Sequence, residues 1–241
     1  MVSINGLVIF GKEKPVSAIL SRLGFFKEDV SKPGLILIRT GARADLKKLV
    51  AFMKKKNIKR AAVFPESKRF LTLLQSNGLK TITFESAMIC IVSETVKKAA
   101  SSTGIKKGKA SAGILSENRS IEILKSLKGA ADYLSCVYIY GKRTAAVSFA
   151  AEEFFSETGI SVINSGDHSF EQCDILITDS KVGNHRGVVI SLNETAGGGG
   201  KSVCGVRLEI PEALKIEEIP DCVNAELLGI KAKISKLIFA R

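Results

Sequence analysis

The chain of 241 residues is 45% hydrophobic and 25% charged, a balance typical of a folded domain that excludes an intrinsically disordered chain. Lysine and arginine number 36 against 24 aspartates and glutamates, and the resulting net charge of +12 favours anionic partners. No apolar run reaches the roughly 18 residues of a membrane span. The opening segment MVSINGLVIFGKEKP lacks a basic leader, so we expect a cytoplasmic protein with no membrane partner.

The cysteines are widely spaced, odd in number and free of any C-x-x-C pair. This spacing predicts neither a disulfide framework nor a thiolate zinc site, and we expect no metal site. Cys136 and Cys173 lie in apolar runs, where the expected role is that of a small buried thiol.

In the first part of the chain, apolar runs of strand length alternate with helical periodicity. Strands are expected at 7–10, 35–38, 61–64 and 81–84. Three helices, whose apolar faces include Val16, Leu49 and Phe70, separate these strands. The order strand, helix, strand indicates βαβ units with parallel pairing and right-handed crossovers.

The small, basic stretch STGIKKGK at 102–109 is a candidate linker or long surface loop. Beyond it, strands are expected at 111–116, 136–140, 160–164, 173–179 and 187–192. The sequence therefore predicts an α/β fold with a Rossmann-like, doubly wound and mostly parallel sheet. The chain length fits either one large domain or two α/β subdomains, which we place at 1–103 and 110–241.

The run AGGGGKS at 196–202 resembles the end of a phosphate-binding P-loop. The full pattern requires a first glycine at position 195, which is Thr195, and a helix after the loop. The following segment 203–210 alternates like a strand instead. We therefore predict an antiparallel C-terminal hairpin whose tip is the glycine run, and no P-loop.

Four turns between a strand and a helix carry two cations each. They occupy residues 11–15, 39–43, 66–69 and 141–144. Cations are unfavourable at a helix N-terminus, which already carries about half a positive charge, and a local rule broken repeatedly suggests a functional site. In one doubly wound sheet these turns would share the carboxyl edge. The predicted anion-binding residues are Lys12, Arg39, Arg43, Lys68 and Arg69.

The segment 137–167 looks like the first βαβ unit of a Rossmann-type nucleotide site. Its turn, Gly141 to Thr144, is the candidate cofactor-binding element, in which Gly141 allows a sharp turn and Thr144 caps the helix. Arg143 stands where a dinucleotide fingerprint has its second glycine. Because the second strand ends without a carboxylate, Lys142 and Arg143 suit NADP or another phosphorylated nucleotide better than NAD.

The catalytic candidates are His168 and the adjacent Asp167, expected in a loop after a strand. His185, in another loop, reads as an ordinary histidine. No nucleophile elbow, H-E-x-x-H motif or paired carboxylates accompany them, so the sequence leaves open whether the protein is an enzyme.

Three functions remain open at this level. The first is binding of a phosphorylated small molecule or nucleotide, with an NADP-dependent oxidoreductase as one form. The second is RNA binding through the same basic edge, although the chain has no tryptophan to stack on bases. The third is a non-enzymatic scaffold or assembly subunit with an acidic partner. The sequence sets no oligomeric state.

Overall fold

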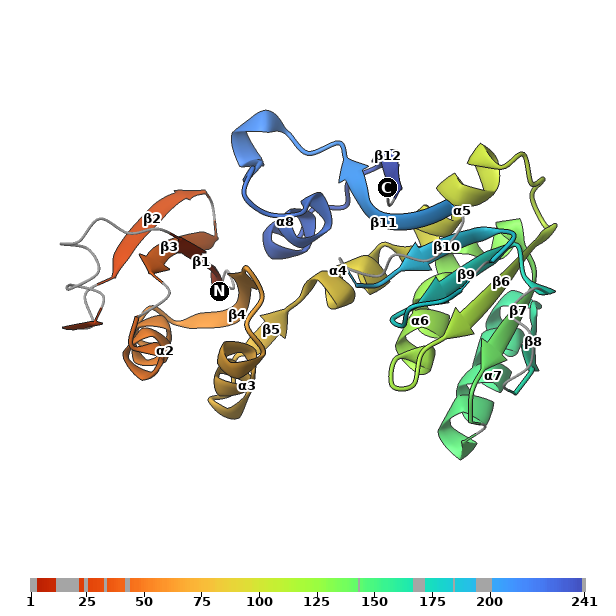
Figure 1. Ribbon diagram of the computed structural model, residues 1–241, viewed down its shortest axis with the longest axis horizontal. Coiled ribbons are helices and arrows are strands. Elements are labelled where there is room, and N and C mark those ends of the chain that lie inside the picture. Colours follow the sequence, from red (N-terminus) through yellow and green to blue (C-terminus); the bar gives the residue numbers. More distant parts are fainter. Residues whose placement is uncertain are drawn as a thin grey trace. The chain divides into compact units, whose positions relative to one another are not determined.

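The computed structural model describes residues 4–11, 22–23, 26–32, 34–41, 44–142, 144–166, 172–183, 185–193 and 201–239 (Figure 1). The chain divides into two compact units, and one of them is interrupted by the other. Unit 1 comprises Met1–Thr83 and Ile210–Lys231, and unit 2 comprises Phe84–Glu209 and Ala232–Arg241. Whether 1–103 and 110–241 also fold as separate pieces stays a prediction.

Unit 1 contains a five-stranded sheet in the order β2-β3-β1-β4-β5. Its elements are β1 (Ile4–Gly11), β2 (Lys27–Lys32), β3 (Leu35–Gly41), α2 (Leu46–Lys55), β4 (Ile58–Phe64), α3 (Lys68–Ser76), β5 (Lys80–Ile82), a 3-10 turn (Glu212–Leu214) and α8 (Asp221–Leu228). β1, β3, β4 and β5 are parallel, and β2 joins the edge in antiparallel orientation. The near-continuous apolar runs in the central strands are those of a parallel sheet covered on both faces.

The helices of unit 1 are fixed to this sheet by apolar faces and caps. Asp45 caps α2 by accepting from the backbone N–H groups of Lys47 and Lys48 at 3.0 and 3.2 Å. The helix then buries Leu49 and Met53 against the sheet.

The late segment of unit 1 is held by polar contacts as well. The Asn5 side chain donates to the carbonyl oxygen of Leu227, and Arg60 pairs with Glu226. These contacts fasten α8 to β1 and β4, which lie more than a hundred residues earlier in the chain.

Unit 2 contains a seven-stranded sheet in the order β12-β11-β10-β9-β6-β7-β8. Its elements are α4 (Phe84–Cys90), α5 (Val92–Ser102), β6 (Ala110–Leu115), α6 (Ser120–Leu127), a 3-10 helix (Lys128–Tyr133), β7 (Leu134–Tyr140), α7 (Ala145–Thr158), β8 (Ser161–Asn164), β9 (Ile175–Thr178), β10 (Val188–Ser191), β11 (Lys201–Leu208) and β12 (Ile234–Phe239). The predicted loop at 102–109 is exposed and joins α5 to β6 inside this unit.

Numbered from β6, the strands of unit 2 follow the order 3-2-1-4-5-6, with β12 added as an antiparallel seventh strand. This is the strand order of the Rossmann fold. Figure 1 shows β9, β6, β7 and β8 side by side, with α6 and α7 next to each other along the sheet. The predicted α/β, mostly parallel, Rossmann-like fold is confirmed.

The C-terminal strands need one correction. The antiparallel pair is present between β11 and β12, where Val206 faces Leu237. β10 and β11, which flank the glycine run, are instead parallel, with Val188 opposite Lys201. The run therefore connects two parallel strands and is not the tip of a hairpin. The period-two pattern of 203–210 predicts a strand but carries no information about its direction.

Candidate functional site

The strand order of unit 2 sets the place where a ligand would bind. β7, the next strand in the chain, lies on one side of β6, and β9 lies on the other side. The connections that follow β6 and β9 therefore run in opposite directions along the sheet. In open α/β sheets this arrangement opens a crevice at the carboxyl ends of the two central strands. In this sheet those carboxyl ends are Leu115 of β6 and Thr178 of β9.

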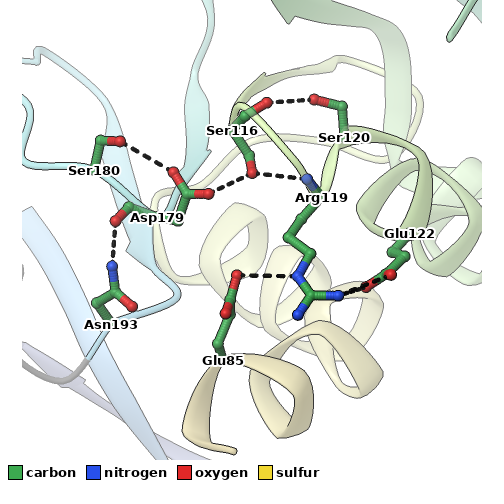
Figure 2. Close-up of polar contacts among 8 residues, drawn as sticks. All are labelled: Glu85, Ser116, Arg119, Ser120, Glu122, Asp179, Ser180 and Asn193. Atoms are coloured by element: carbon green, nitrogen blue, oxygen red, sulfur yellow. Dashed lines mark hydrogen bonds and ion pairs between the residues drawn. The ribbon is translucent and has the colours of Figure 1, made fainter. Parts of the chain in front are cut away.

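The turn from β6 to α6 is closed by its own side chains. The Ser116 hydroxyl accepts from the backbone N–H of Arg119 at 3.1 Å, and the Ser120 hydroxyl donates to the Ser116 carbonyl at 2.7 Å. Figure 2 shows the Ser116 hydroxyl between this N–H group and the carboxylate of Asp179, to which it donates. The turn therefore has a fixed shape with its serine oxygens already engaged.

Asp179 fastens the loops that follow the neighbouring strands. Its second carboxylate oxygen accepts from the hydroxyl of Ser180 at 3.0 Å, and its backbone carbonyl accepts from the side-chain amide of Asn193 (Figure 2). Ser116 follows β6, Asp179 follows β9 and Asn193 follows β10. One carboxylate group and its backbone thus tie together three loops at the crevice.

The only cation in this turn is already paired with carboxylates. The Arg119 guanidinium lies 2.9 Å from Glu122 on α6 and 3.4 Å from Glu85 on α4 (Figure 2). Partial burial by itself would lower the pKa of Arg119, and the two carboxylates more than offset it, so that the pKa is raised. Arg119 consequently joins α4 to α6 as a permanent charge.

A cavity of about 660 Å³ lies between the β6–α6 turn and the β7–α7 turn. Ser116 and Asn118 line one side, and Tyr140 and Lys142 line the other. Its apolar lining comes from Leu115, Ile121, Ile139 and Val147. A cavity with an apolar surface and a few polar groups is typical of sites for small molecules.

The β7–α7 turn contains the residues predicted to bind a cofactor. Gly141 has φ of 130°, a conformation that side-chain-bearing residues rarely adopt. Thr144 caps α7, as predicted, by accepting from the N–H of Val147 at 3.2 Å. Lys142 is exposed at the rim of the cavity, and Arg143 lies outside the described residues.

The predicted anion-binding residues belong to unit 1, whereas this turn belongs to unit 2. Lys68 and Arg69 are exposed at the start of α3, and Arg39 lies in β3, all in unit 1. Lys12 and Arg43 lie outside the described residues. Because the basic turns belong to two different sheets, the prediction that they share one edge of one sheet is wrong.

Arg39 has a local role in unit 1. Its guanidinium pairs with Glu218, and this hydrogen bond lowers the pKa of the Glu218 carboxyl. Arg39, which we predicted to bind an anion, therefore joins β3 to the segment that precedes α8.

The catalytic candidates Asp167 and His168 lie outside the described residues. His185 is buried, with its Nε2 3.6 Å from the sulfur of Cys173 and its Nδ1 accepting from the N–H of Gly187 at 3.0 Å. Burial raises the pKa of the Cys173 thiol to about 11, so it is protonated at neutral pH. The predicted buried thiol at Cys173 is confirmed.

Among the described ranges, no group of three His, Cys, Asp or Glu side chains could hold a metal ion. None of the helices within those ranges is long and apolar enough to cross a membrane.

Sequence reasoning missed Ser116, Asp179 and Asn193. It took 137–167 for the first βαβ unit of the nucleotide fold, whereas the sheet order makes it the second. The first unit begins at β6, whose turn has no glycine between Leu115 and Leu124 to mark it. The available signal was a strand ending in serine, ILS, and a later strand ending in aspartate, ILITD.

No protein-family model matches the chain, and no curated protein sequence matches it. Several solved structures resemble it at low identity. Quinate dehydrogenase from Corynebacterium glutamicum, in complex with NAD, is 12% identical over 78% of this chain and 79% of that one, with a TM-score of 0.35. Shikimate 5-dehydrogenase from Listeria monocytogenes, in complex with shikimate and NAD, is 14% identical over 79% of this chain and 78% of that one. Its TM-score is also 0.35.

A third structure, the A chain of dipicolinate synthase from Bacillus subtilis, is 11% identical over 96% of this chain and 87% of that one, with a TM-score of 0.37. At these identities and TM-scores the likeness carries no argument about activity. The Rossmann assignment of unit 2 rests on its own strand order.

Proposed function

We propose that unit 2 binds a phosphorylated nucleotide, or a small molecule of similar size, in the cavity between the β6–α6 and β7–α7 turns. The observation that carries this proposal is the position of the cavity. It lies where the 3-2-1-4-5-6 sheet order puts the adenosine end of a nucleotide, beside the ends of the first and second strands.

The charges at the end of β7 favour a phosphate at the ribose. A nucleotide with a free ribose 2′-hydroxyl usually meets a carboxylate at this position, whereas a 2′-phosphate meets a cation. This chain has Tyr140, Gly141 and Lys142 there, followed in sequence by Arg143. The first turn of α7 has no acidic residue, so its N-terminal partial charge adds to the attraction. Of the two nicotinamide nucleotides, the turn suits NADP rather than NAD.

The apolar lining of the cavity supports an aromatic base next to this phosphate. Ile121 and Ile139 offer flat apolar contact, and Thr144 offers a hydroxyl at the rim. We assign no reaction to the unit, and an NADP-dependent oxidoreductase is the enzyme class that this proposal would serve. Among the described residues, no specific feature favours the RNA-binding or scaffold alternatives.

Calorimetric titration of the full chain with adenosine 2′-monophosphate, and with adenosine as reference, tests the proposal. We expect the phosphate to improve binding and Lys142→Glu to weaken binding of the phosphate form about tenfold or more, because a charge-assisted hydrogen bond is worth about 1.5–3 kcal/mol. Lys98→Glu, a charge reversal at an exposed position on α5, is the matched control and should change nothing. Equal binding of the two compounds would refute the proposal.

A further inference from the structure

A dinucleotide needs a second phosphate position that this crevice does not offer. In Rossmann sites the diphosphate lies at the N-terminus of the first helix, and glycines let the backbone approach it closely. The corresponding turn here precedes α6 and reads Ser116-Glu117-Asn118-Arg119-Ser120. Each of these residues carries a side chain where the fingerprint requires open backbone.

The hydrogen-bonding groups of this turn are engaged from within. The N–H of Arg119, a donor that a phosphate oxygen would use, is bound at 3.1 Å by the Ser116 hydroxyl. That hydroxyl in turn donates to Asp179. A phosphate oxygen would have to displace the Ser116 hydroxyl, which Asp179 holds in place, before it could accept from this N–H group.

The charge of the crevice also opposes a diphosphate. The Asp179 carboxylate stands at the end of β9, against the turn, and Glu117 is exposed within the turn. Arg119, the single cation, already faces Glu85 and Glu122 (Figure 2). The turn and the side chains bound to it therefore carry four carboxylates and one guanidinium, at the place where a dinucleotide would add two more negative charges.

We infer that unit 2 selects ligands with a single phosphate group, held at the β7–α7 turn, and that the Ser116–Asp179 pair excludes ligands with a bridging diphosphate. The inference rests on the proposed function and narrows its ligand class to nucleoside monophosphates and molecules of that kind, which leaves out NADP and, with it, the NADP-dependent oxidoreductase named above. Asp179 acts here as a specificity-determining residue. Its carboxylate accepts a hydrogen bond from the Ser116 hydroxyl at the turn where a Rossmann sheet usually binds the diphosphate of a dinucleotide.

Calorimetric titration of the full chain with adenosine 2′-monophosphate and with NADP⁺ tests the inference, since both carry the same 2′-phosphate. We expect NADP⁺ to bind at least about tenfold more weakly than the monophosphate. Equal or tighter binding of NADP⁺ would overturn the inference while the proposed function stands. If neither compound binds, the proposed function fails and this inference fails with it.

Asp179→Asn preserves the shape of the side chain and removes its charge. We expect this variant to bind NADP⁺ about tenfold more tightly than the parent chain, with unchanged affinity for the monophosphate. Asp174→Asn is the matched control: Asp174 accepts from the Ser111 hydroxyl at 2.6 Å just before β9, at the opposite end of the strand.

The control variant should leave both affinities as they are. If Asp179→Asn does not fold, as judged by its thermal unfolding, Asp179→Ser provides the same readout with a smaller side chain. A charge-free variant that folds and gains no affinity for NADP⁺ would show that the carboxylate is not what excludes the diphosphate.

Discussion

Gly113, in the middle of β6, lets two larger side chains occupy the space beside the strand. A Cβ atom at this position would lie 2.5 Å from the sulfur of Cys173 and 2.8 Å from a ring carbon of Tyr140. Both side chains are buried, and Tyr140 also lines the candidate cavity. The glycine therefore determines where one wall of that cavity stands.

We expect Gly113→Ala to lower the free energy of unfolding by about 1–3 kcal/mol, because overpacking of a tight core forces its neighbours to move. Urea denaturation followed by circular dichroism measures this change. Gly183→Ala is the control, since a Cβ there meets no atom within 4 Å and the glycine has no positive φ. Similar losses in the two variants would contradict this account of Gly113.

Single residues also mark the limit of prediction from sequence. The capping role of Thr144 and the burial of Cys173 follow from local pattern, and both are confirmed. The pairing of Ser116 with Asp179 joins positions 63 residues apart in the chain. Only the parallel pairing of β6 with β9 brings them together, and no local pattern encodes that pairing.

At the scale of elements, α7 combines a formed N-terminal cap with a narrow buried face. Only Ala150 and Phe154 are buried along its length, while Phe149 and Phe155 are 70% and 52% exposed. A helix with so narrow a buried face gains less from packing than α2, which buries Leu49 and Met53 against the sheet of unit 1.

We therefore expect Thr144→Ala to destabilise unit 2 by about 1 kcal/mol, the typical contribution of an N-cap. Thr144→Ser keeps an acceptor oxygen and should recover most of this loss. The shift of the urea midpoint in the absence of ligand measures both variants. If alanine and serine behave alike, the hydrogen bond to Val147 does not stabilise the helix.

The alternation of strands and helices was predictable, and their order in the sheet was not. The runs CVYIY and CDILITD were correctly expected to be strands. The chain gives no sign that β9 returns to pair with β6 rather than with β8, because an apolar run predicts a strand without naming its neighbour in the sheet. For this reason the predicted first βαβ unit, 137–167, is in fact the second unit of the nucleotide fold.

On the scale of the whole molecule, the main surprise is the return of residues 210–231 to unit 1. The sequence offers one linker-like stretch, 102–109, and no local pattern indicates that residues 210–231 return to unit 1. The contacts that decide the matter, Asn5 with Leu227 and Arg60 with Glu226, each join residues more than 150 positions apart.

Two matched substitutions test whether the units are stabilised separately. Leu227 on α8 and Leu127 on α6 are both buried, and each change to alanine should cost about 2–5 kcal/mol. Native-state hydrogen exchange should show Leu227→Ala reducing amide protection in β1 and β4 but not in β6 and β9. Leu127→Ala should do the reverse. Equal loss of protection in both sheets would mean that the units unfold together.

The interrupted path of unit 1 also has a consequence for biosynthesis. A ribosome adds about 5–20 residues per second, so the strands of the first sheet wait on the order of ten seconds before α8 has been translated. During that interval the apolar surface that α8 later covers stays open to chaperones and proteases. The first sheet thus lacks its last helix for as long as unit 2 is being made.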